Sequence, residues 1–264
     1  MLPMSEFNTD TIDQVLATSD PGERNRAEHL WGDRLMINIG NVAAWLFPIL
    51  MIAIVSQVFL RKAGMNQAWL DDAQWWIYGF AMISGFGYAI TTDSHVRVDI
   101  FHEHFSDAKK ARIEVFAIGW LLLPFLALMS DILMHYSYAS FSVREGSDSP
   151  NGLHGLYMLK MSMPVLFWAA IIAGFAALHR NLMKITQPVL WKTIIAAFPA
   201  LWFVADRGVY YILWWYVRFT NDEIVSRRIG KEAILDNVLW YGLALLVIIA
   251  AVSYWRNRSN SLKA

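Results

Sequence analysis

The chain has 264 residues, of which 56% are hydrophobic and only 17% are charged, and its 22 basic and 22 acidic residues cancel. Soluble domains are typically about 45–50% apolar and about 25% charged. The composition therefore indicates an integral membrane protein, and the balanced charge gives no support to nucleic-acid binding. The absence of cysteine excludes disulfide frameworks, iron–sulfur clusters, thiolate zinc sites and cysteine nucleophiles.

The first segment, residues 1–34, is polar. Its first 30 residues contain six acidic residues and two arginines, with no apolar run among them. A signal peptide needs a basic start followed by an apolar stretch. We therefore expect this segment to be a cytoplasmic extension and not a cleaved leader.

Four apolar stretches follow along the chain. They occupy residues 35–60, 73–92, 113–134 and 161–178. A membrane-spanning helix needs about 20 apolar residues, each contributing a rise of about 1.5 Å. The sequence therefore predicts an all-α integral membrane protein with a four-span helical core in residues 35–185.

The C-terminal extension, residues 186–264, is expected to add two further spans at about 193–217 and 237–255. Asp206 and Arg207 interrupt the first of these at its centre. A charge at mid-bilayer is costly, so these side chains must face protein or water, or the segment does not span as one helix.

The distribution of basic residues predicts the orientation. With the N-terminus in the cytoplasm, six spans place 13 basic residues inside and nine outside. This asymmetry is the one that the positive-inside rule favours. Both termini are therefore expected to lie in the cytoplasm.

The connection between the second and third spans, residues 91–112, reads TTDSHVRVDIFHEHFSDAKKAR. Its candidate metal ligands are His95, Asp99, His102 and His104. They lack the i, i+4 spacing of the HExxH zinc motif. We interpret the segment as a structural cytoplasmic loop containing His95, Arg97 and Asp99, with Ser106 as the N-cap of the next helix. Neither a metal nor a catalytic residue is expected.

Asp131 and His135 lie four residues apart in the third span, hence on one helix face. An acid within the membrane is a functional candidate by default, although helix rise places this pair near the outer end of the span. Histidines also raise an alternative function, a haem-binding membrane anchor of an oxidoreductase. Of the candidates, only His95 and His179 match in depth. A self-sufficient carrier using Asp206 and Arg207 is a third hypothesis.

The second span carries small residues along its length and acidic and aromatic residues at its outer end. Small residues permit close helix approach, either within the chain or with another subunit. Tryptophans at such a boundary are typical interfacial anchors. The residues considered for subunit contact are Asp71, Asp72, Trp75, Trp76, Gly79 and Gly85.

Two stretches carry a family resemblance. They are DDAQWWIYGFAMISGFGYAITTDSHVRVDIF, residues 71–101, and EGSDSPNGLHGLYMLKMSMPVLF, residues 145–167. In their order and spacing, and with the four-span pattern, they resemble the small membrane subunit (DctQ-like) of tripartite ATP-independent periplasmic (TRAP) transporters. The resemblance covers about residues 30–185, and residues 186–264 extend beyond the usual four spans.

The resemblance implies a non-enzymatic subunit of a secondary transporter in the bacterial inner membrane, with no cofactor. In that family a periplasmic solute-binding protein captures the solute, often a carboxylate. A large permease subunit holds the transport and sodium sites. The small subunit packs against the large one as a scaffold, so both proteins are expected partners during ion-gradient-driven uptake.

Overall fold

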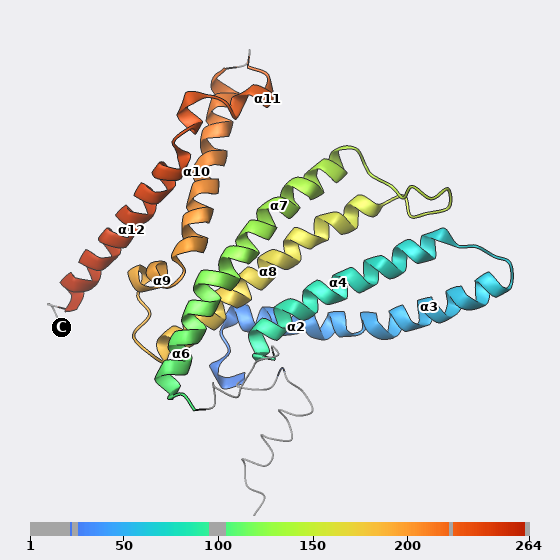
Figure 1. Cartoon of the computed structure of the whole chain (residues 1–264), viewed down its shortest axis with the longest axis horizontal. Coiled ribbons are helices and arrows are strands. Elements are labelled where there is room, and N and C mark those ends of the chain that lie inside the picture. Colours follow the sequence, from blue (N-terminus) through green and yellow to red (C-terminus); the bar gives the residue numbers. More distant parts are fainter. Residues whose placement is uncertain (1–21, 23–25, 95–103, 222–223, 262–264) are drawn as a thin grey trace, which may run out of the picture. The chain divides into compact units, whose positions relative to one another are not determined.

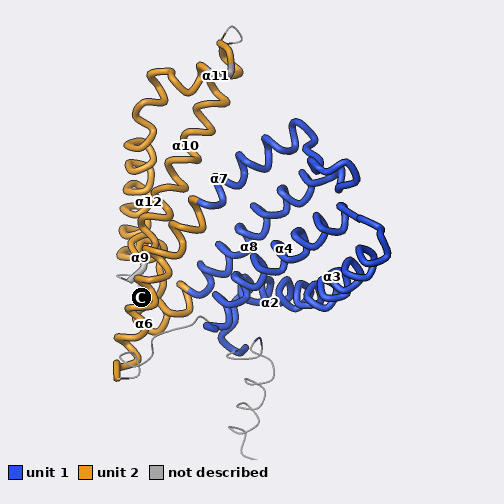
Figure 2. The backbone as a smooth tube through the Cα atoms, turned by 45° about the vertical axis from the view of Figure 1, so that its right-hand side comes forward, with its two compact units in different colours: residues 1–103, 129–177 blue, residues 104–128, 178–264 orange. Residues whose placement is uncertain are grey.

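The computed structural model describes residues 22, 26–94, 104–221 and 224–261. These residues form helices and no strands, which confirms the predicted all-α class. Figure 1 labels the helices along the chain. The chain divides into two compact units, one of residues 1–103 and 129–177 and the other of residues 104–128 and 178–264 (Figure 2).

Within the described residues, four helices are long and apolar enough to cross a membrane. They are Trp31–Lys62, Asp107–Ser142, Leu156–Met183 and Val238–Ser259. This confirms a multi-pass membrane protein. The helices α4 (Ala68–Thr92) and α10 (Phe198–Thr220) have 25 and 23 residues, enough to span, but neither is among the helices with a sufficiently apolar 18-residue stretch. That these two cross the membrane stays a prediction.

The first predicted span consists of two helices, α2 (Trp31–Ala44) and α3 (Leu46–Lys62). They meet at Trp45, and Pro48 lies in the first turn of α3, where its missing N–H would have no helical partner in any case. At the start of α2, Asp33 is fully buried and its Oδ2 accepts a hydrogen bond from Leu30 N at 2.9 Å. This bond satisfies one of the backbone donors that a helix leaves open at its N-terminus.

Glycines let the helices of the first unit approach closely. A methyl group at Gly87 of α4 would lie 2.5 Å from Sδ of the fully buried Met36 in α2. A methyl group at Gly32 of α2 would lie 2.8 Å from Ile172 in α8 (Leu156–Met183). Glycines therefore allow both α4 and α8 to lie close to α2.

The third predicted span is one helical run with an irregular segment. It comprises α6 (Asp107–Phe116), a π-helical turn at Ala117–Leu122 and α7 (Leu123–Ser142). Ser106 precedes it in extended backbone, as predicted for an N-cap, although its side chain makes no capping hydrogen bond within the described residues. π-helical turns of this kind are local widenings of an α-helix.

The π-helical turn lies against the C-terminal extension in the second unit. A methyl group at Gly119 would overlap the carbonyl oxygen of Ala196 and lie 2.9 Å from its carbon. Aromatic rings continue this contact, with centroids 5.9, 6.3 and 5.7 Å apart, in the order Phe116, Trp120, Phe198 and Trp202. Residues 186–264 thus contain helices that pack on part of the third span.

The predicted span 193–217 does not form one helix. The short helix α9 (Leu190–Ala196) ends at Ala197, which has a non-helical backbone (φ −117°, ψ 30°), and α10 then begins with Pro199 in its first turn. Proline is disfavoured inside a helix because it lacks a donor and restricts the preceding residue. The break therefore falls at Ala197, while α10 continues through Asp206 and Arg207 without interruption.

The helices α10 and α12 (Val238–Ser261) pack together as a hairpin. The connection between them contains α11 (Ser226–Ile229) and a 3₁₀ turn (Ala233–Leu235). A small apolar core closes this end of the hairpin, made of Val217, Ile229, Leu235 and Val238. This core holds the connection on the ends of both helices.

Replacing Gly119 with alanine should destabilise the second unit. The added methyl group would meet the Ala196 carbonyl, and overpacking of this kind costs about 1–3 kcal/mol. Gly208→Ala in α10 is the matched control, since no described atom lies within 4 Å of its added methyl group. Thermal unfolding followed by tryptophan fluorescence should show a lower midpoint for Gly119→Ala only. Equal midpoints for the two variants would contradict the close packing.

Candidate functional site

A polar cluster joins the C-terminal end of α3 to the start of α4. Arg61 Nη2 donates to both carboxylate oxygens of Asp71, at 3.0 and 2.8 Å. The buried Gln57 donates to the same carboxylate and accepts a hydrogen bond of 2.6 Å from Gln74. A carboxylate that accepts from a guanidinium and an amide makes strong, charge-assisted bonds, so this cluster fixes the turn between the two helices.

The neighbouring acid, Asp72, holds the loop between α7 and α8, residues 143–155. Its Oδ2 accepts a hydrogen bond of 3.0 Å from Leu153 N, a residue 81 positions further along the chain. Gly152 lies beside this bond, and a methyl group there would be 2.7 Å from the same oxygen. The loop also closes on itself, because Ser147 N donates to Leu153 O at 2.9 Å. Asp72 therefore docks a folded loop on the start of α4.

The same loop is tied to α8 by an ion pair. Lys160 Nζ lies 2.6 Å from Glu145 Oε1 and 4.5 Å from the centre of the Tyr136 ring. Ser137 of α7 adds a hydrogen bond of 2.5 Å to the Lys160 carbonyl. The hydrogen bond from Lys160 is the main cause that lowers the pKa of Glu145 below its ordinary value of 4.5.

The residues predicted for subunit contact separate into two groups. Asp71 and Asp72 have partners within the chain, as described above. Trp75 is 74% exposed, and a methyl group at Gly79 or Gly85 would meet no described atom within 4 Å. Trp76 is partly buried, and its Nε1 has no hydrogen-bond partner among the described residues. The open positions on α4 are thus Trp75, Gly79 and Gly85.

Gly85 lines a shallow groove of about 270 Å³ between α2 and α4. Its other lining residues are four small ones, Gly40, Ala43, Ala44 and Ala81, and three larger ones, Asn41, Phe47 and Tyr88. Gly40 and Ala44 are four residues apart, and so are Ala81 and Gly85. Small residues at this four-residue spacing allow a second helix to approach closely in a membrane. The groove is therefore an arrangement that could receive a helix of another subunit.

The charged pair in α10 is buried on one side. Asp206 is 6% exposed and accepts hydrogen bonds from Arg207 Nε and Nη2 at 2.8 and 2.6 Å. The facing helix α12 carries Gly242, where a methyl group would lie 2.8 Å from Asp206 N. Arg207 is also 5.0 Å from the Tyr210 ring. Adjacent residues point about 100° apart on a helix, but the long Arg207 side chain reaches back to Asp206. The two charges therefore neutralise each other, so neither needs a separate partner.

The remaining predicted sites are dispersed. His95, Arg97 and Asp99 lie outside the described residues, and so does His102. Asp131 is half-buried and His135 exposed in α7. Within the part of the chain that the structure describes, no three histidine or acidic side chains come close enough to hold a metal ion.

Sequence reasoning did not identify four residues that organise these polar contacts: Gln57, Arg61, Glu145 and Lys160. A signal was present for the first pair, because Gln57 stands one turn before Arg61 at the end of an otherwise apolar run. No comparable pattern links Glu145 to Lys160, since a loop of unknown conformation separates them.

Removing the Asp72 carboxylate should release the 143–155 loop. A hydrogen bond to a charged group contributes about 1.5–3 kcal/mol, so Asp72→Ala should speed proteolytic cleavage of this loop and lower the thermal midpoint. Asp148→Ala, which removes an exposed acid from the same loop, is the control. If both variants are cleaved at the wild-type rate, Asp72 does not hold the loop.

The Glu145–Lys160 pair should make stability depend on pH in one direction. Because the pKa of Glu145 is lowered in the folded chain, its contribution is present above pH 4.5 and is lost as the pH falls through the folded-state pKa. The midpoint difference between wild type and Glu145→Gln should therefore be largest near neutral pH and shrink on acidification below pH 4.5. A difference that grows on acidification would contradict this pairing.

Comparison with known proteins shows one match. The family described as "Tripartite ATP-independent periplasmic transporters, DctQ component" matches residues 50–187, just over half of the chain. No curated protein and no solved structure matches the chain. The match begins within α3 and ends shortly after α8, so α9, α10 and α12 lie beyond it. The family confirms the resemblance carried by the 71–101 and 145–167 stretches: the chain belongs to the DctQ family and is a small membrane subunit of a TRAP transporter.

Proposed function

We propose that the chain is the scaffold of a TRAP transporter that takes up a small organic solute, of the carboxylate class. A periplasmic solute-binding protein delivers the solute, and a large permease subunit carries it inward at the expense of an ion gradient. The small subunit binds the large one within the inner membrane, and both of its termini lie in the cytoplasm.

The groove between α2 and α4 is the observation that carries the scaffold role. Transmembrane helices associate through close van der Waals packing, because the surrounding lipid is as apolar as their side chains and the hydrophobic effect does not drive them together. Gly85 and Ala44, both exposed in this groove, meet this requirement, since a methyl group at Gly85 would contact no described atom within 4 Å. We assign the groove to a helix of the large permease subunit, with Trp75 and Gly79 along the same helix as further contacts.

The contacts of the polar residues support a static scaffold role for this chain and not a role in binding the transported solute. Solute sites in secondary transporters bring polar groups and helix ends together near the bilayer midplane. Here Asp71 and Asp72 are bound to a turn and a loop at the end of α4, and Asp206 is bound to Arg207. Groups already engaged in structural contacts are poor candidates for binding a solute that must come and go.

The loop containing His95, Arg97 and Asp99 is proposed to act in assembly on the cytoplasmic side. Its four basic residues, Arg97, Lys109, Lys110 and Arg112, fit the positive-inside rule for this side. The haem-anchor alternative gains nothing from the family, which is one of transporter components.

Filling the α2–α4 groove should prevent assembly. A methyl group at Gly85 would meet no described atom within 4 Å, so we expect Gly85→Phe to leave the chain folded while its ring displaces the partner helix. A mismatch of about 1.4 kcal/mol reduces binding about tenfold. The large subunit recovered with the affinity-tagged variant should therefore fall about tenfold or more.

Gly208→Phe in α10 is the matched control, because this glycine is equally open but lies beyond the family match. It should leave the recovered large subunit unchanged. Uptake by the complexes that do assemble should show an unaltered half-saturating solute concentration. Normal assembly of Gly85→Phe, or a large shift in half-saturation, would contradict the scaffold proposal.

A further inference from the structure

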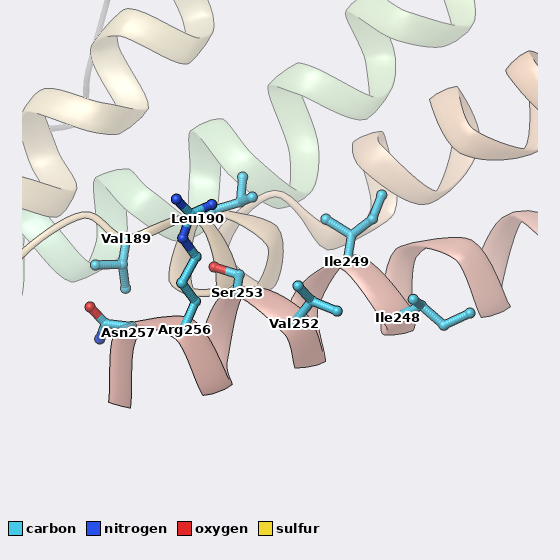
Figure 3. A pocket seen from close by; sticks show the side chains of 8 residues that line it. All are labelled: Val189, Leu190, Ile248, Ile249, Val252, Ser253, Arg256 and Asn257. Atoms are coloured by element: carbon cyan, nitrogen blue, oxygen red, sulfur yellow. The ribbon is translucent and has the colours of Figure 1, made fainter. Parts of the chain in front are cut away.

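A groove of about 480 Å³ lies between the start of α9 and the last turns of α12, outside the residues that match the family. Its walls toward the middle of α12 are aliphatic, from Ile248, Ile249 and Val252. Its other end carries polar side chains, Ser253, Arg256 and Asn257. Figure 3 shows the Arg256 side chain extending from α12 toward Leu190 of α9. The groove therefore has an aliphatic wall at one end and the cationic Arg256 side chain at the other.

The polar end of this groove lies near the end of α12, at the depth of a membrane boundary. The apolar helix runs from Val238 to Ser259, and at a rise of about 1.5 Å per residue Arg256 lies about 27 Å from its start. The hydrocarbon core of a bilayer is about 30 Å thick. Ile248, by the same measure, lies about 15 Å along the helix, close to the midplane. The groove thus extends from the bilayer interior to the headgroup region.

Aromatic residues mark the same boundary. The rings of Trp191 and Tyr254 meet edge to face with centroids 5.6 Å apart, and Trp255 is largely exposed. Tryptophan and tyrosine concentrate at the level of lipid headgroups. A hydrogen bond of 3.2 Å from Trp191 N to Ser253 Oγ fixes α9 against α12 here, so the two walls of the groove are held together by the chain itself.

We propose that this groove binds an anionic phospholipid of the leaflet that faces the C-terminus. The phosphate is held by Arg256 with Asn257 beside it, and an acyl chain lies along Val252, Ile249 and Ile248. A guanidinium matches a phosphate through paired, charge-assisted hydrogen bonds. Basic pockets at this depth in membrane proteins bind anionic headgroups.

A phospholipid fits the groove better than a helix of a partner protein does. A helix covering the whole groove would bury the Arg256 charge, which is costly unless the partner supplies an acid. A phospholipid places its charge at the boundary and its hydrocarbon below, in the same order as the walls of the groove. Val252, 59% exposed, and Ile248, 60% exposed, would then be covered by an acyl chain without displacing any described part of the protein.

The test is lipid retention by the purified full-length chain, measured by native mass spectrometry after equilibration with equal amounts of phosphatidylglycerol and phosphatidylcholine. One basic side chain near a membrane surface corresponds to a preference of about fivefold. The wild type should retain one phosphatidylglycerol with about that preference. Arg256→Gln should reduce the preference to parity, and Arg256→Lys should keep most of it.

Two matched controls separate this site from general effects. Arg258→Gln removes a charge from the same turn of α12 but from outside the groove, and it should keep the preference. Val252→Trp fills the acyl wall and should abolish retention, whereas Val247→Trp, on an exposed position away from the groove, should not. Helix content measured by circular dichroism confirms that each variant folds.

Three outcomes would overturn the proposal. They are equal retention of both lipids by the wild type, equal losses for Arg256→Gln and Arg258→Gln, and undiminished retention by Val252→Trp. Loss of the lipid from the wild type when it is purified with the large subunit would instead identify the groove as a protein interface. None of these results bears on the Gly85 groove, so the scaffold proposal is tested separately.

Discussion

Helices in a lipid bilayer gain little by hiding apolar side chains from one another, because the surrounding lipid is equally apolar. They associate when their backbones can come close enough for dense van der Waals contact. In each unit of this chain there are glycines where an added methyl group would lie less than 3.0 Å from a neighbouring segment. Gly32 faces Ile172 and Gly87 faces Met36 in the first unit. In the second unit Gly119 faces the Ala196 carbonyl and Gly242 faces the Asp206 backbone. Other features of the two units follow from these approaches, because they determine which faces are covered and which stay open.

The polar side chains then act where the glycines have brought segments together. Asp72 can hold the 143–155 loop only because the start of α4 and the end of α7 lie at the same end of the first unit. Asp206 is buried because Gly242 allows α12 to cover it, and Arg207 neutralises it from the same helix. In a medium of low dielectric an unpaired charge is costly, so close packing and charge pairing have to occur together.

The open surfaces fall on different parts of the chain, and this separation has functional meaning. The α4 wall of the α2–α4 groove, with Ala81 and Gly85, lies within the family region, while its other wall precedes it. The α9–α12 groove lies beyond that region and combines aliphatic walls with Arg256. A C-terminal extension that carries its own lipid site would add a contact with the bilayer to a scaffold that otherwise contacts protein.

The amino-acid sequence by itself determined the helical membrane class and the family, and it located the long apolar helices approximately. Apolar run length and motif order are properties of contiguous residues, and these can be read along the chain. Only the tertiary structure decided that the 193–217 stretch breaks at Ala197, that Asp71 pairs with Arg61 and Asp72 with the 143–155 loop, and that Asp206 is covered at Gly242. The first two are local but depend on the exact backbone geometry, and the contacts of Asp72 and Asp206 depend on distances between segments far apart in sequence. Such distances are set by how closely helix surfaces pack, a property that no local stretch encodes alone.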